Sequence, residues 1–191
     1  METYLIIDVV LISVASILWL LYHIVLAVRI RFRPLLTTQG MNMVVRSLWV
    51  HNVMKNTAST GILVVQTMRN LIMAASFLST VSITLGLAFL NFALTNNSRI
   101  SRYAYLGSSN PNIEFVKILM MFLCMVFSFF NFVICIRNLN HATTLMLLPP
   151  EARRLVQVTE AEVSPDNAAK VYNRGMLHFT LGMRGYYMLI P

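Results

Sequence analysis

The chain has 191 residues, of which 57% are hydrophobic and only 12% are charged, and its net charge is +8. Soluble domains carry about 25% charged residues, so this composition excludes an ordinary water-soluble domain and indicates a protein whose solvent is lipid. The basic residues flank long apolar runs, which fits anionic lipid headgroups and membrane topology and does not fit a nucleic-acid-binding face.

The first run without charge lies between Asp8 and Arg29. A helix that crosses a bilayer needs about 20 residues, so we predict a span at about residues 6–29. The run is longer than the apolar region of a signal peptide, which has about 7–15 residues, and no basic residue precedes it. Arg31 and Arg33 follow at its end. We therefore expect an uncleaved first span with its N terminus on the non-cytosolic side.

Residues 41–55 form a basic amphipathic segment in the loop that follows. Its apolar residues share one helical face, and Arg46 lies away from that face. Two interpretations remain open, because such a helix suits a headgroup surface and equally suits packing against the cytosolic end of its own bundle. The residues of the apolar face are Met41, Val45, Leu48 and Trp49.

Two further runs without charge, between Arg69 and Arg99 and between Lys117 and Arg137, are also long enough to span a bilayer. The third helix is expected to continue past its apolar run until Pro149, since proline ends a helix. The predicted spans are about residues 69–95 and 115–147.

Basic residues are divided unequally between the two sides of these spans. The loop of residues 29–69 has no acidic residue and carries Arg29, Arg31, Arg33, Arg46, Lys55 and Arg69. Short loops rich in Lys and Arg remain in the cytosol, so this loop is predicted to be cytosolic, the next loop to face the other side and the C-terminal tail to return. We favour a plasma-membrane or endomembrane location.

The C-terminal region predicts one more helix. Ser164 and Pro165 read as an N-cap followed by proline at the first helical position, which indicates a helix over about residues 165–188. The apolar end after Arg184 is too short to cross a bilayer and resembles the entrance of a fourth span. The predicted fold class is therefore all-α: a single membrane domain, residues 1–191, built as a polytopic helical bundle with three complete transmembrane helices, amphipathic helices and an incomplete fourth span.

Each predicted span carries a stripe of small or polar residues at helical spacing. Inside lipid such residues usually face other helices, so we expect a seam for helix packing. A pore or substrate path is the alternative, but such paths usually include an intramembrane charge, and these runs contain none. The seam residues are Ser13, Ser16 and His23 in the first span, Ala75, Ser79, Ser82 and Gly86 in the second, and Ser128, Asn131 and Asn138 in the third.

A second set of residues gathers at the predicted cytosolic ends of the spans. Their ordinary role is to extend toward headgroups, and the sharper hypothesis is a basic pocket between helices for an anionic lipid or solute. The set comprises Arg46, Arg69, Asn70, Arg137 and His141. His23 and His141 lie on the same side of the membrane, but a lone histidine at a helix end more often binds a neighbouring group than a metal or haem iron. No cofactor and no metal is expected.

Motifs of common catalytic sites are missing from the sequence, among them a Walker loop, GxGxxG, GxSxG, HExxH and CxxC. The leading hypothesis is a non-enzymatic helical bundle that works by association, as a homo-oligomer or beside a membrane-protein partner. The alternative is a small-solute transporter or channel with a basic cytosolic mouth. A membrane-bound redox or lipid-modifying enzyme is a third possibility, resting on the two histidines alone.

Several segments of the chain resemble one known family over nearly the whole length. They are RSLWV at 46–50, VQTMRNLIMAASFLST at 65–80, NRG at 173–175 and LGMRGYY at 181–187. The chain resembles the domain-of-unknown-function 599 membrane family, and within it the land-plant members. The resemblance implies a four-helix membrane protein without an established activity, and it supplies no catalytic or ligand residue. Members usually continue with a further apolar run containing tryptophan and Phe-Gly-Pro, so we expect a C-terminally truncated form, whether a splice form, a truncated gene model or a fragment.

Overall fold

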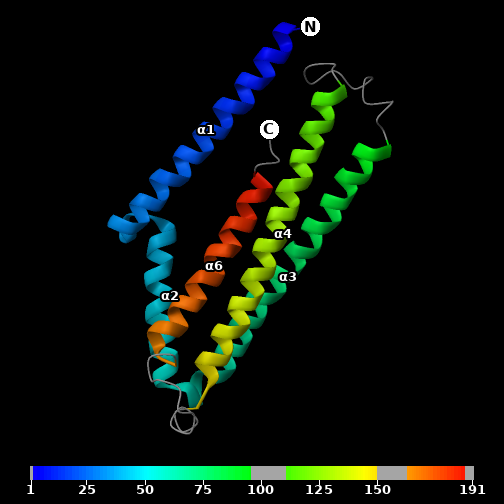
Figure 1. Ribbon diagram of the computed structural model, residues 1–191. Helices are drawn as coiled ribbons and strands as arrows, with labels where there is room; N and C mark the ends of the chain where they lie inside the picture. The colour runs from blue at the N-terminus through cyan, green and yellow to red at the C-terminus, as the bar shows by residue number, and fades with distance from the viewer. Residues whose placement is uncertain (1, 96–110, 150–162, 188–191) are drawn as a thin grey trace. The chain divides into compact units, whose positions relative to one another are not determined.

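The computed structural model describes residues 2–95, 111–149 and 163–187. Within these residues the chain is almost entirely helical and contains no strand, which confirms the predicted all-α fold (Figure 1). The helices are α1 (Glu2–Phe32), α2 (Thr38–Lys55), α3 (Thr57–Thr95), α4 (Pro111–Leu147) and α6 (Pro165–Tyr187), with a short 3₁₀ turn, η1, at Pro34–Leu36.

Three of the described helices are long and apolar enough to cross a membrane, which is the number that the sequence predicted. The segments are Ser13–Phe32, Thr57–Thr95 and Phe115–Leu147. The helix α3 has 39 residues and α4 has 37. At 1.5 Å per residue they are about 58 and 55 Å long, whereas the hydrocarbon core is about 30 Å thick. Each helix is therefore longer than a bilayer is thick. The parts of α3 before Arg69 and of α4 after Arg137 lie outside the uncharged runs of these helices.

The chain divides into two compact units, residues 1–41 with 85–123, and residues 42–84 with 124–191. In the first unit, the turn between η1 and α2 requires a glycine at position 40. A Cβ atom there would collide with the backbone of Pro34. Thr37 closes the same turn, because its hydroxyl oxygen accepts a hydrogen bond from the Gly40 backbone N–H at 3.1 Å. The link between η1 and α2 is thus tight.

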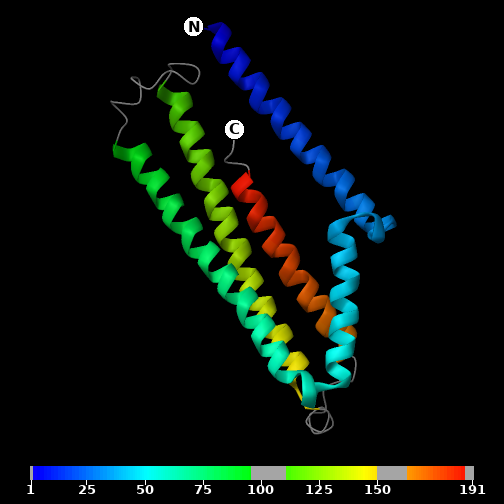
Figure 2. The same cartoon turned by 180° about the vertical axis from the view of Figure 1, so that it is seen from behind.

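The second unit packs parts of four helices, α2, α3, α4 and α6, side by side (Figures 1 and 2). Helices α3 and α4 are antiparallel, so Gly61 near the start of α3 lies against Leu147 at the end of α4. Helix α6 runs beside α4 in the opposite direction. Its Gly175 lies against Leu139, and its Gly182 lies against Phe132. Higher residue numbers in α6 thus correspond to lower numbers in α4.

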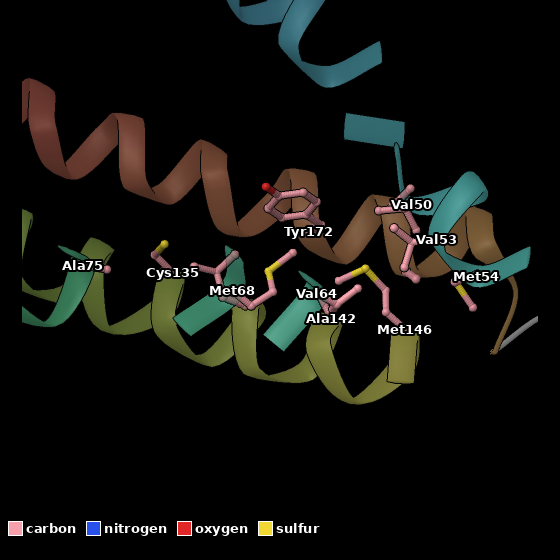
Figure 3. Close-up of a cluster of buried hydrophobic side chains, with 13 residues drawn as sticks. Val50, Val53, Met54, Val64, Met68, Ala75, Cys135, Ala142, Met146 and Tyr172 are labelled. Atoms are coloured by element: carbon pink, nitrogen blue, oxygen red, sulfur yellow. The ribbon is translucent and has the colours of Figure 1, made fainter. Parts of the chain in front are cut away.

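The hydrophobic core of this unit lies largely at the end of the bundle formed by the part of α3 before Arg69 and the part of α4 after Arg137. Figure 3 shows side chains from the four helices pointing into one shared space. Full burial of a Val, Leu or Met side chain contributes about 1.5–3 kcal/mol, so this cluster is the main source of stability for the extended ends. Its members are Val50, Val53 and Met54 of α2, Val64, Met68 and Ala75 of α3, Cys135, Leu139, Ala142 and Met146 of α4, and Ala168, Ala169 and Tyr172 of α6.

Helix α2 packs with a different face from the one that its sequence pattern singled out. The buried residues are Val50, Val53 and Met54, in its C-terminal half. Of the predicted apolar face, Trp49 packs against the core, while Met41, Val45 and Leu48 are exposed. Packing against the bundle and contact with a headgroup surface, the two interpretations of this helix, therefore concern two different faces of it.

Candidate functional site: the polar seams and the α2–α6 contact

The polar seam of α3 is closed by a tyrosine near the end of α6. The hydroxyl groups of Ser82 and Tyr186 lie 2.8 Å apart. Each also lies 2.8 Å from the backbone carbonyl oxygen of Leu78. Because the two hydroxyl groups have one proton each, two of these three contacts are hydrogen bonds at any one time. Ser82 is fully buried. A hydroxyl that is buried without a partner costs free energy, and this one has the Leu78 carbonyl and the Tyr186 hydroxyl within hydrogen-bond distance.

The polar seam of α4 meets a histidine of α6. The side-chain amide of Asn131 donates to the backbone carbonyl of Phe127 at 2.9 Å, so its Oδ1 atom is left as an acceptor. His178 Nδ1 lies 2.9 Å from that Oδ1 and therefore carries the proton. One turn earlier, buried Ser128 donates to the carbonyl of Cys124 at 3.0 Å. These three side chains satisfy one another or their own helix.

Glycines allow the backbone of α6 to approach α4 closely at this level. A Cβ atom at Gly182 would lie 2.8 Å from the ring of Phe132. A Cβ atom at Gly185 would collide with the hydroxyl of Ser128. Small residues at a helix interface permit such contact in membranes. The seam residues Ser128 and Asn131 are thus covered by α6.

The remaining seam residues differ in burial, and Asn138 and His23 are partly buried. Ala75, Ser79 and Gly86 are buried, and Asn138 donates to the carbonyl of Ile134 at 2.9 Å. In α1, Ser13 is exposed, and the side chain of Ser16 lies outside the described part of the structure. His23 Nδ1 lies 2.8 Å from the backbone carbonyl oxygen of Trp19. The centroids of the His23 and Trp19 rings are 4.0 Å apart.

Arg46 takes part in a contact between α2 and α6. Its Nε–H donates to Oδ1 of Asn173 at 2.8 Å, and its guanidinium lies 5.8 Å from the centre of the Tyr172 ring. The amide of Asn173 donates in turn to the Met43 carbonyl at 3.2 Å and lies 3.1 Å from the Ser47 hydroxyl. Burial lowers the pKa of Arg46 and raises the pKa of Tyr172, and the mutual attraction of the two groups opposes both shifts.

The other residues of the predicted basic pocket, Arg69, Asn70, Arg137 and His141, are exposed. Their convergence with Arg46 into one pocket stays a prediction. Arg69 instead borders a shallow groove of about 500 Å³ at the start of α3. The groove is lined by Ala58, Gly61, Ile62, Val65, Gln66, Arg69 and Leu147.

Sequence reasoning singled out Arg46 but missed its partner Asn173, and it also missed His178 and Tyr186. All three lie in α6, which was interpreted by its ends and not by its polar face. His51 of α2 and Asp166 of α6 form a further pair at 3.0 Å that was not foreseen. Across the described residues no group of three or more His, Cys, Asp or Glu side chains is placed to hold a metal ion.

The sequence profile of DUF599, described as a protein of unknown function, matches residues 10–191. This chain belongs to the DUF599 family. The DUF599 match includes all of α2, α3, α4 and α6, so both the covered seams and the α2–α6 contact lie within the family domain. A search of curated proteins and a search of solved structures each found no match. With three helices apolar enough to cross a bilayer, this DUF599 chain is a membrane protein.

Proposed function

We propose that this DUF599 protein is a non-enzymatic helical bundle that works by associating with a second copy of itself or with another membrane protein. Its N terminus lies on the non-cytosolic side, and the loop of residues 29–69 lies in the cytosol. The excess of Lys and Arg in that loop supports this orientation. The ends of α3 and α4 beyond Arg69 and Arg137 then project into the cytosol.

One observation carries the proposal of association. Ile62 is 76% exposed, and Leu63 and Val65 are also exposed. All three precede Arg69, so in the proposed orientation they lie on the part of α3 that projects from the bilayer. Ile62 and Val65, together with Leu147 of α4, line the groove of about 500 Å³. A contiguous apolar surface in water marks an interaction site. We expect a partner helix to cover it.

The polar seams support packing more than a path for solutes. Ser82, Ser128 and Asn131 are buried and hydrogen-bonded, and α6 lies across them. A conducting path needs polar groups that are free to replace the hydration shell of a solute. We therefore expect the purified protein in proteoliposomes to show no solute flux above that of empty vesicles, and a specific, saturable flux would favour the transporter alternative.

Photo-crosslinking in native membranes tests the association. A photoreactive amino acid replaces Ile62 and, in the matched control, Asn140, which is exposed on the polar surface of α4. We expect an adduct of defined mass from position 62, corresponding either to two chains or to one chain and another membrane protein, and no adduct from position 140. Unmodified monomer from both positions would contradict the proposal.

A charge placed in the patch supplies a second measurement. Ile62→Glu should abolish adduct formation from a photoreactive residue at position 65, because a carboxylate would have to be desolvated at the interface. Since Ile62 is largely exposed, the variant should keep the helical circular-dichroism spectrum and thermal midpoint of the unsubstituted protein.

A further inference from the structure

Helix α2 changes character along its exposed surface. In its N-terminal half, most exposed residues are apolar: beside the polar Thr38 and Asn42, Val44, Val45 and Leu48 are 37%, 55% and 65% exposed. One turn later the exposed residues are Asn52 and Lys55. We call Val44, Val45 and Leu48 the α2 strip. A helix in water has no reason to expose such a strip at one end only, so the switch indicates a change of solvent along the helix axis.

Helices α4 and α6 show the same change. In α4, the exposed surface is apolar at Phe130, Val133 and Ile134, and it is polar or charged at Arg137, Asn140, His141 and Thr144. In α6, the exposed residues Asp166, Lys170 and Arg174 are followed by the exposed apolar residue Leu177. The helix α4 is one of the candidate spans, and basic residues gather at headgroups, so we take its switch at Arg137 as the edge of the hydrocarbon layer.

Contacts between the helices show that the three switches lie at similar depth. A Cβ atom at Gly175 of α6 would lie 3.3 Å from Cβ of Asn138, the residue after Arg137. Two residues earlier in α6, Asn173 binds the Met43 carbonyl and the Ser47 hydroxyl of α2. The segment 43–47 of α2 is therefore within about one helical turn, roughly 5 Å, of the level of Arg137.

We infer that the α2 strip lies in the interfacial layer of the bilayer and contacts lipid, so that α2 is a membrane-contacting helix that does not span. We assign lipid as the occupant for two reasons. The strip lies at the same depth as the apolar, lipid-facing surface of α4. The exposed surface of α2 becomes polar at Asn52, at about the depth where the surface of α4 also becomes polar. The inference depends on where the spans lie and is independent of the proposed association at Ile62.

Depth-dependent quenching tests the inference on the full chain. An environment-sensitive fluorescent amino acid is introduced at position 45 or, in the matched control, at position 52 of the same helix. Each protein is reconstituted in phosphatidylcholine vesicles at a high ratio of lipid to protein, with nitroxide-labelled phosphatidylcholine as quencher. We expect quenching by the lipid nitroxide to be several-fold stronger at position 45, with a blue-shifted emission, and quenching by iodide in the buffer to be several-fold stronger at position 52.

Two results would overturn the inference. Equal, weak lipid quenching at both positions would place the α2 strip in water. A blue-shifted emission at position 45 that neither quencher reduces would mean that protein covers the strip. Because positions 45 and 52 are both exposed, the probes should be accommodated without loss of the fold, which a circular-dichroism melt of each labelled protein checks.

Discussion

The distance between α6 and α4 is set by single glycine residues. At Gly185, a methyl group would meet both the Ser128 hydroxyl and the backbone carbonyl of Cys124. We predict that Gly185→Ala lowers the free energy of unfolding by about 1–3 kcal/mol, the usual cost of inserting a methyl group into a packed interface. Thermal unfolding in detergent, followed by circular dichroism, measures the effect.

Gly61 supplies the matched control, because its added Cβ atom would meet Leu147 only at an ordinary 3.8 Å. Gly61→Ala should be neutral or should stabilise by up to about 1 kcal/mol, since alanine favours the helix. Adding Ser128→Ala to Gly185→Ala should restore part of the lost stability. Equal melting temperatures for the two glycine variants would show that α6 does not approach α4 this closely.

Between helices, Asn173 holds α2 against α6. Its side chain contacts Arg46, Ser47 and the Met43 carbonyl of α2. We predict that Asn173→Ala destabilises this contact by about 1–3 kcal/mol, because it leaves the half-buried guanidinium of Arg46 without its acceptor. Hydrogen exchange of the backbone amides of α2, residues 38–55, should become faster.

Asn138→Ala is the appropriate comparison. In the described contacts, the Asn138 amide donates only to the Ile134 carbonyl of its own helix. The substitution also keeps the Cβ atom that lies beside Gly175. Exchange in α2 should stay as it is in the unsubstituted protein. Slow exchange in α2 after Asn173→Ala would mean that the core residues Val50 and Val53 alone hold the helix.

The positions of the helices could be predicted from sequence, whereas most contacts between them could not. Uncharged runs indicated the three helices long enough to span, and Ser164 does act as an N-cap, accepting from the Asn167 N–H at 3.2 Å. Asn173 and Met43, however, are 130 residues apart, and helical periodicity indicates which residues share a face without indicating what that face meets. For this reason only Trp49 of the apolar face predicted for α2 packs against the core, while Met41, Val45 and Leu48 are exposed.

For the molecule as a whole, the division of basic residues predicts its orientation in the membrane. A reporter fused to the N terminus should be accessible only from the non-cytosolic side. One inserted at Asn56, the exposed residue between α2 and α3, should be accessible only from the cytosol. Impermeant labelling of intact cells, before and after permeabilisation, distinguishes the two positions, and accessibility of both from the same side would contradict the orientation.

The length of α3 has a mechanical consequence. From Gly61 to Ile83 it is one unbroken helix of about 33 Å that belongs to a single packed unit, so the two ends of this segment move together when the helix tilts. Spanning helices adjust their tilt when the thickness of the bilayer changes. A tilt of about 10° around Ile83 would displace Gly61, with the groove beside it, by roughly 6 Å. In the orientation proposed above, the position of the groove beside Gly61 therefore depends on the thickness of the membrane.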